Sequence, residues 1–255
     1  MILNLVVLPA LPVPAKADNA FVNSLGMTFV PVPGTDVLMC IHETRKGDYA
    51  AFAQKQSKLD KSWEMVEAYG VPVSENDDHP VVNVSWHDAK AFCEWLSQKE
   101  GLTYRLPTDR EWSYAAGIGT KEAKGTTPER LDEKILKRYP WGPQWPPPNG
   151  VGNLADTAGV ARIQGLIAVP GYTDGFATTA PVMQFKPNKL GLFDLSGNVW
   201  EWCQDWYNEK RAERVLRGGS WHYAPLNLLS SDRLYNVPET RDMYRGFRCV
   251  IEKRP

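Results

Sequence analysis

The residue types that most often carry catalysis or hold transition metals are few in this chain. The histidines are His42, His79, His87 and His222, and the cysteines are Cys40, Cys93, Cys203 and Cys249. No two histidines have the His-x-x-x-His spacing that places two imidazoles on one helix face. No Ser-His-Asp arrangement, glycine-rich phosphate loop or nucleotide-binding fingerprint occurs either. The sequence therefore indicates none of these familiar catalytic or metal centres.

The segment 222–245 mixes aromatic, small polar and charged side chains. The positions that stand out are His222, Tyr223, Tyr235, Asn236, Thr240, Asp242 and Tyr244. Tyrosine offers a large contact area at low entropic cost, so this composition suits an adaptable recognition surface. The alternative is an ordinary exposed surface with some tyrosines. His222 could act as a general acid or base, but no nucleophile or orienting carboxylate is identifiable beside it, which favours simple contact with ligand or water.

Short strands and a helix are expected to build the first third of the domain. The pattern predicts strand structure within residues 21–33 and a fully apolar strand at 37–41. Thr44 is expected to cap a helix that runs to about Gln54. The polar residues 55–78 are expected to form an irregular surface loop.

The clearest helix signal lies at residues 85–100. Ser85 and Asp88 can form a capping-box-like start, and Gly101 ends the pattern. The expected core face consists of Ala89, Phe92, Cys93 and Leu96. A second short helix is expected to begin after Thr108, with Glu111 completing its box. Residues 121–137 read as solvated, and loops packed by aromatic side chains are expected from residue 139 onward.

Composition limits the function classes. The chain has 255 residues, 43% of them hydrophobic, with ten tryptophans, enough for a sizeable core. Its net charge of −1 supplies no positive field for nucleic acid or an anionic membrane. Twenty prolines and twenty glycines indicate many turns and long loops.

Residues 1–20 are expected to be a leader or linker, and residues 21–255 a single domain. The apolar start and the Ala-Lys-Ala sequence at 15–17 are typical of a secretory signal. Against export, the segment lacks a positive n-region, and Pro9, Pro12 and Pro14 interrupt its apolar run. Secreted, periplasmic and cytoplasmic locations all remain open. No other segment is apolar for long enough to span a bilayer.

Five motifs occur in order along the chain. They are RLPTDREW at 105–112, YPWG at 139–142, GLFDLSGNVWEW at 191–202, RGGSW at 217–221 and RGFR at 245–248. Together they resemble the formylglycine-generating enzyme, or sulfatase-modifying factor, family over roughly residues 21–252. The resemblance implies a compact, loop-rich α+β fold related to C-type lectins, with little regular secondary structure.

The resemblance also bears on copper. In copper-dependent members of this family, two cysteines five residues apart follow the Gly-Gly-Ser motif and oxidise a substrate cysteine. The matching positions here are Tyr223 and Leu228, and no cysteine lies between Gly218 and Phe247. Neither residue supplies the soft thiolate that Cu(I) prefers. Copper binding and copper-dependent formylglycine generation are therefore not expected.

Two structural calcium sites are implied by the same resemblance. The first matches Asn153, Leu154, Asp174 and Phe176, and the second matches Asp194, Gly197, Val199 and Glu201. Carboxylates and backbone carbonyls are the ligands that calcium prefers. The alternative is that Asp174 and Glu201 accept backbone N–H groups in turns. Ligand chemistry favours calcium more strongly at the second site, because the loop inside the first differs from that of the family.

The resemblance further implies a disulfide between Cys93 and Cys249. The alternative is a pair of buried thiols packed side by side in a reducing cytosol. Cys40 and Cys203 are expected to be buried hydrophobic residues rather than reactive groups.

Three functions are compatible with these features. The favoured one is a non-catalytic, C-type-lectin-like ligand-binding module, since both copper cysteines and an acid–base constellation are missing. Variable proteins of diversity-generating retroelements share this fold and diversify the segment that corresponds to 222–245, so this chain could be one of them. The alternatives are an oxidoreductase of the sulfatase-modifying type and a metabolite-maturation enzyme that uses the same groove. The expected partner is a protein, a peptide or a small molecule.

Overall fold

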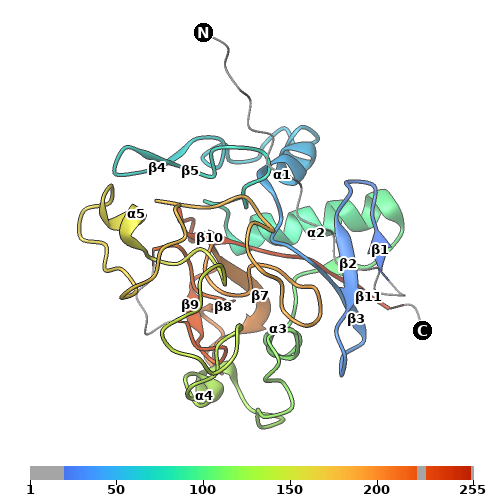
Figure 1. Cartoon of the computed structure of the whole chain (residues 1–255). Coiled ribbons are helices and arrows are strands. Elements are labelled where there is room, and N and C mark those ends of the chain that lie inside the picture. Colours follow the sequence, from blue (N-terminus) through green and yellow to red (C-terminus); the bar gives the residue numbers. More distant parts are fainter. Residues whose placement is uncertain (1–19, 223–227, 254–255) are drawn as a thin grey trace.

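The computed structural model describes residues 20–222 and 228–253. A five-stranded sheet has the order β1 (Phe21–Val22), β2 (Thr28–Pro31), β3 (Val37–Cys40), β11 (Val250–Glu252) and β6 (Tyr104–Arg105). All its strand pairs are antiparallel. It brings both ends of the described chain together, because β11 pairs with β3 (Figure 1). The strand structure predicted within 21–33 is thus divided by a turn at Gly26, where φ is 75°.

A second sheet of four strands organises the C-terminal half. Its order is β10 (Arg245–Gly246), β7 (Trp200–Trp206), β8 (Arg214–Arg217) and β9 (Leu234–Asn236). β10 pairs with β7 in parallel, whereas the other two pairs are antiparallel. Strands β4 (Val66–Ala68) and β5 (Val71–Val73) form a separate hairpin. This hairpin corrects the expectation of an irregular loop over 55–78. Ala68, Val71 and Val73 are buried, so packing against the domain imposes strands there.

Five helices accompany the sheets within the described residues. They are α1 (Lys46–Ala53), α2 (Trp86–Glu100), α3 (Asp109–Ala115), α4 (Pro128–Leu131) and α5 (Thr157–Val160). The predicted starts of α2 and α3 are confirmed, because Ser85 with Asp88 and Thr108 with Glu111 form capping boxes. Gly101 ends α2 in the left-handed conformation, with φ of 68°. None of the helices in the described ranges is long and apolar enough to cross a membrane.

The start of α1 differs from the prediction. Its N-cap is Arg45, whose backbone N–H donates to Asp48. Thr44 instead forms strand-like backbone bonds: its N–H donates to Phe247 and its carbonyl accepts from Val81. These long-range bonds hold Thr44 one residue before the helix, so tertiary contacts decide where α1 begins.

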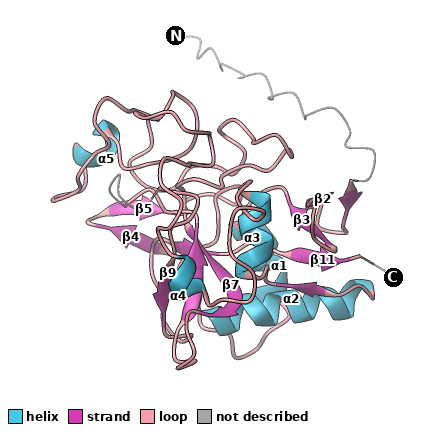
Figure 2. Ribbon diagram, turned by 90° about the horizontal axis from the view of Figure 1, so that it is seen from below, coloured by secondary structure: helices cyan, strands magenta, loops and turns pink. Residues whose placement is uncertain are grey.

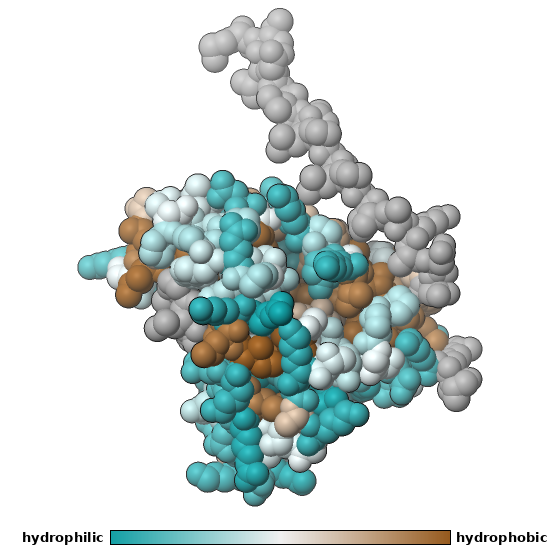
Figure 3. Space-filling model, turned by 60° about the horizontal axis from the view of Figure 1, so that its bottom comes forward, coloured by the Kyte–Doolittle hydropathy of each residue, from teal (hydrophilic) through white to brown (hydrophobic). Residues whose placement is uncertain are grey.

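The core lies between α2 and the sheets. The predicted face of α2 is buried, and its cluster includes Phe29, Tyr49, Trp202 and Phe247. Figure 2 shows α2 along one side of the molecule and a broad layer of loops on the opposite side. The face in Figure 3 is mainly hydrophilic, with apolar side chains gathered in separate areas. Regular elements therefore supply a rigid base for loops that carry most of the predicted sites.

Candidate functional site

The four-stranded sheet divides the predicted recognition segment between its two edges. Tyr235 and Asn236 lie on the edge strand β9. Asp242 and Tyr244 come just before β10, at the opposite edge. Since β7 and β8 lie between them and neighbouring strands are about 4.8 Å apart, the edges are separated by roughly 14 Å. Tyr223 lies outside the described residues. The predicted face is thus two clusters rather than one patch.

The first cluster surrounds β9. The ring of Tyr235 stacks on that of Tyr207 with centroids 4.0 Å apart, and 42% of Tyr235 is exposed. The Tyr207 hydroxyl donates to the Asp132 carboxylate at 3.1 Å. Asn236 Oδ1 accepts the hydroxyl of Thr240 at 2.9 Å, which fixes the turn after β9. This cluster presents an anchored aromatic ring beside a rigid polar turn.

The second cluster surrounds His222. Its ring stacks on Tyr244, with centroids 5.5 Å apart and planes 17° apart. Burial lowers the pKa of His222, and the nearby Asp242 carboxylate opposes this shift. Asp242 also accepts the backbone N–H of Asn83 through its carbonyl, at 2.8 Å. His222, Asp242 and Tyr244 are therefore brought together, with the imidazole favoured in its neutral form.

The connecting segment 237–242 crosses the beginning of α2. Pro238 accepts the backbone N–H of Trp86 at 3.0 Å. Arg241 forms an ion pair with Asp88 at 2.8 Å. These contacts anchor the segment to a helix, so the two clusters are held at a fixed separation.

Of the two positions that hold the copper cysteines in the family, the structure describes Leu228, which lies in an apolar environment. Leu228 is 1% exposed and belongs to a buried cluster with Leu154, Val169 and Tyr172. Cys40 and Cys203 are buried as expected, and burial raises the pKa of both thiols. No group of three or more His, Cys, Asp or Glu side chains in the described ranges is placed to hold a metal ion.

Cys93 and Cys249 lie side by side in the core. Their sulfur atoms are 3.4 Å apart, and both residues are free thiols in this structure. Contact with the Cys93 thiol adds to burial in raising the pKa of Cys249. The sulfurs are close enough for a disulfide after a small movement, so the disulfide between them stays a prediction.

The first predicted calcium cluster is assembled around Asp174. One carboxylate oxygen accepts the N–H of Leu154 at 2.8 Å, and the other accepts that of Phe176 at 2.9 Å. Burial raises the pKa of Asp174 to about 7. Asn153 is fully buried, and its Oδ1 has no hydrogen-bond partner among the described residues. Asp174 thus accepts backbone N–H groups with both oxygens, as the alternative to calcium expected. The unpartnered Oδ1 of Asn153 fits the oxygen chemistry of calcium, so calcium binding at this cluster stays a prediction.

The second predicted cluster fits calcium less well. Both oxygens of Glu201 are engaged by Arg248, at 2.6 and 2.7 Å, and Trp112 donates to one of them at 3.0 Å. Glu201 and Arg248 are completely buried. Asp194 Oδ2 accepts the N–H of Met183, whereas its Oδ1 has no partner in the described part of the chain. A cation would have to displace or share the guanidinium, so the geometry favours the first cluster over the second.

Glu43 is a buried carboxylate without a local sequence signal. Its two oxygens accept the side-chain amide of Asn198 at 2.6 Å and the N–H of Val199 at 3.1 Å. Burial, together with the charges of Asp194 and Glu201, raises the pKa of Glu43 well above its usual range. Its role depends on residues about 155 positions away, so no local pattern could reveal it.

Comparison with known proteins identifies the scaffold. The family described as "Sulfatase-modifying factor enzyme 1-like domain" matches residues 11–253. The chain is 31% identical over 219 residues to a formylglycine-generating enzyme of Thermomonospora curvata, covering 74% of this chain and 61% of that protein. It is 33% identical over 204 residues to inactive C-alpha-formylglycine-generating enzyme 2 of Bos taurus, covering 74% and 54%. The chain thus spans only part of the length of these relatives.

A solved structure shows the same fold. Treponema denticola variable protein 1 superimposes with a TM-score of 0.61 at 21% identity, covering 92% of this chain and 98% of that one. This confirms the expected compact α+β fold of formylglycine-generating enzymes and variable proteins, with its low content of regular structure. At this identity the likeness concerns the fold alone.

Proposed function

Because this chain belongs to the sulfatase-modifying factor enzyme 1-like domain family, we propose that it is a non-catalytic ligand-binding module built on that scaffold. Its identity to an active relative, 31%, is close to its identity to an inactive one, 33%. Overall similarity therefore does not decide activity, and the residues at the reactive positions must. Fold alone does not fix function.

The burial of Leu228 carries the proposal. It places an aliphatic side chain, packed against Leu154 and Tyr172, at one of the two positions that hold copper thiolates in the family. Cu(I) prefers soft thiolate ligands. The described cysteines are all buried, and the raised pKa of Cys40 and Cys203 disfavours their thiolate forms. This arrangement supports a scaffold that has lost the oxidase centre.

The binding face of the proposed module comprises the two clusters at the sheet edges. Each contains a stacked aromatic pair, Tyr207 with Tyr235 and His222 with Tyr244. Rigid aromatic rings bind with little loss of entropy. The turn held by Asn236 and the segment anchored on α2 keep these rings in place, which limits the ordering cost of binding. The ligand is a protein, a peptide or a small molecule.

A more specific version of this proposal is that a diversity-generating retroelement varies the residues of the binding face. It predicts that codons at the face positions derive from adenine-rich template codons, with a near-copy of the segment beside a reverse-transcriptase gene. Glu239 and Met243 do not fit the simplest asparagine-codon origin and should be invariant. A gene neighbourhood without such a copy would contradict the retroelement version, and the proposal of a binding module would still stand.

The oxidase alternative is tested directly. The protein is loaded with Cu(I) and supplied with a Cys-x-Pro-x-Arg peptide and oxygen, with the Thermomonospora curvata enzyme as positive control. We expect no peptide aldehyde by mass spectrometry, because Leu228 supplies no thiolate. Aldehyde formation by this chain would overturn the proposal.

To test the binding face, peptides that bind the purified protein are first selected from a displayed random library. Replacing Tyr235 by serine should weaken selected peptides at least roughly tenfold, a loss typical of an aromatic anchor. Tyr69→Ser is the matched control, because Tyr69 is 66% exposed and lies at the turn of the β4–β5 hairpin. Equal losses in both variants, or no selectable peptide, would contradict the proposed face.

We also propose that calcium binds at the first cluster. Asn153 and Asp174 would supply side-chain oxygens, and Leu154 and Phe176 would supply backbone carbonyls. When bound, the cation would compensate the half-buried Asp174 carboxylate and hold residues 153–176 together. Its role would be structural, and it would stabilise the loops beside Leu228.

A further inference from the structure

A cavity of about 870 Å³ has no lining residue from either cluster of the predicted face. The six predicted recognition residues that the structure describes do not line it. It is formed by loops that follow α3, the YPWG motif at 139–142 and residues 186–192. Its volume lies within the range of small-molecule sites. The cavity is therefore a separate candidate site.

One wall of the cavity is aromatic. The rings of Tyr139 and Trp141 are stacked with centroids 4.8 Å apart and planes 2° apart. Reciprocal backbone hydrogen bonds between Tyr139 and Gly142, at 3.0 and 2.9 Å, hold the turn. Trp141 Nε1 donates to the carbonyl of Gln144 at 2.9 Å. The aromatic wall is thus fixed before any ligand arrives, which lowers the entropic cost of binding.

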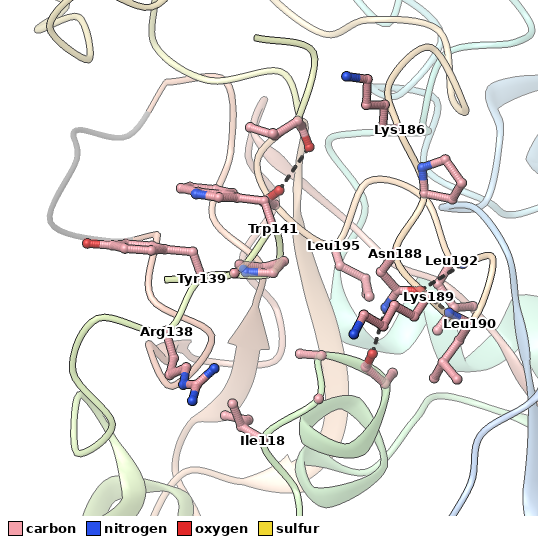
Figure 4. A pocket seen from close by; sticks show the side chains of 18 of the residues that line it. Ile118, Arg138, Tyr139, Trp141, Lys186, Asn188, Lys189, Leu190, Leu192 and Leu195 are labelled. Atoms are coloured by element: carbon pink, nitrogen blue, oxygen red, sulfur yellow. Dashed lines mark hydrogen bonds between the residues drawn. The ribbon is translucent and has the colours of Figure 1, made fainter. Parts of the chain in front are cut away.

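The other wall carries positive charge. Figure 4 shows Lys186 and Lys189 across the cavity from the aromatic wall, with Arg138 near Tyr139. All three cations are exposed, and none forms an ion pair within residues 20–222 and 228–253. Among the described lining residues the one acid is Asp194, which is 3% exposed. The cavity mouth therefore has an uncompensated positive charge.

The lysine wall is also held in place. Asn188 Oδ1 accepts the N–H groups of Leu190 and Leu192, at 2.9 and 3.1 Å. Its Nδ2 donates to the carbonyl of Ala115 at 2.8 Å, which ties the loop to the end of α3. The backbone N–H of Lys186 donates to Gly150 at 3.1 Å. The two walls are thus fixed to neighbouring elements, and the two lysine side chains are exposed.

We propose that this cavity binds a planar organic anion, with its flat body against Tyr139 and Trp141 and its carboxylate or sulfonate toward Lys186 and Lys189. Flat apolar groups pack well on aromatic rings. Lysine ammonium groups act as point charges that adapt to different anions. A neutral ligand would leave the three cations uncompensated, and a cationic one would be repelled. The site goes beyond the proposed recognition face and does not depend on it.

The probe is 2-naphthoate, titrated by calorimetry against the full chain at low salt, with neutral 2-naphthol as the reference compound. We expect naphthoate to bind at least roughly tenfold more tightly than naphthol, since only the anion engages the cations. Raising the salt concentration should weaken naphthoate and leave naphthol unchanged. Equal affinities for the two compounds would overturn the proposal.

Variants locate the binding. Lys186→Met and Lys189→Met should each weaken naphthoate by roughly two- to fivefold, as expected for partly exposed charge pairs. Lys210→Met is the matched control, because Lys210 is exposed, forms no ion pair within the described residues and does not line the cavity. Trp141→Leu should weaken both compounds, with an unchanged circular dichroism spectrum as the check on folding.

Two results would exclude this cavity as the binding site of naphthoate. The first is unchanged naphthoate affinity in the double variant Lys186→Met/Lys189→Met, whose exposed positions leave folding intact. The second is loss of naphthoate binding in Tyr235→Ser, which would place the anion at the recognition face instead. Failure of the selected peptides to compete with naphthoate is the result expected for two separate sites.

Discussion

Two carboxylates that the family pattern assigns to calcium have opposite environments. Glu201 is completely buried and forms two short contacts with the guanidinium of Arg248. Asp174 accepts two backbone N–H groups and has no ion-pair partner within the described ranges. Burial raises the pKa of Asp174 to about 7. Glu201 is thus compensated by an arginine, whereas Asp174 is compensated by backbone N–H groups alone among the described residues.

The largest expected effect is at the paired carboxylate. Glu201→Gln leaves Arg248 buried without its ionic partner, so we expect a loss of about 3–5 kcal/mol in the free energy of unfolding. Urea denaturation followed by tryptophan fluorescence measures it. A loss below about 1 kcal/mol would mean that Glu43 or Asp194, which lie near Arg248, neutralise it instead.

Calcium should act at the unpaired carboxylate. At a concentration one hundred times its dissociation constant it should add about 2.7 kcal/mol to the free energy of unfolding. For a domain of this size that corresponds to a melting temperature higher by about 5–10 °C. Thermal melts with calcium and with a chelator measure the difference.

Variants test whether calcium binds at the cluster around Asp174. Asp174→Asn should abolish the calcium response, and Asp36→Asn, at an exposed loop carboxylate, should retain it. A full response in Asp174→Asn would show that the cation binds elsewhere and would reverse the comparison between the two clusters.

The free energy of unfolding should decrease as the pH rises, because the pKa of Asp174 is raised in the folded state. Its usual value is 3.8, and the folded value is about 7, so the folded state binds the proton more tightly. The stability from this group is complete below about pH 4 and is lost as the pH rises to 7. Asp194 and Asp232, with pKa values raised to about 6 and 7 by burial, act in the same direction.

Urea denaturation in metal-free buffer between pH 4 and pH 8 tests this slope. Asp174→Asn should reduce the decline without removing it, because Asp194 and Asp232 remain. Saturating calcium should also reduce it, since the cation favours the ionised carboxylate. A slope that is identical in wild type and variant would show that Asp174 is not the group responsible.

The smallest effect is expected at an exposed pair. Glu94 forms an ion pair with Lys90 on the surface of α2, and about half of each side chain is exposed. Glu94→Gln should cost no more than about 0.5 kcal/mol, as is usual for exposed helix pairs. A larger loss would show that exposure does not explain the difference between Glu201 and ordinary surface carboxylates.

Local hydrogen bonds account for what could be predicted of the fold. Ser85 and Thr108 bond within three residues of themselves, so a short sequence contains both partners of each helix cap. The apolar spacing of α2 likewise points to its buried face without further information. By contrast, the N-cap of α1 is Arg45 and not the predicted Thr44, because the backbone of Thr44 is hydrogen-bonded to residues far away in the chain.

The candidate sites were predictable only as residue types. The sequence predicts that 222–245 is rich in recognition residues, but sheet order alone decides that Tyr235 and Tyr244 lie at opposite edges. The wall of lysines faces Tyr139 and Trp141 only because distant loops meet.

The sequence by itself determined the family, the main helix caps and the absence of cysteines from both copper positions, because each depends on residue identity or on neighbours a few positions away. Tertiary structure decided which carboxylate is paired with a cationic side chain. Glu201 is neutralised by Arg248, 47 positions later, and Glu43 reaches Asn198 across 155. Electrostatic compensation depends on distance in space and on burial, and neither can be inferred from spacing along the chain.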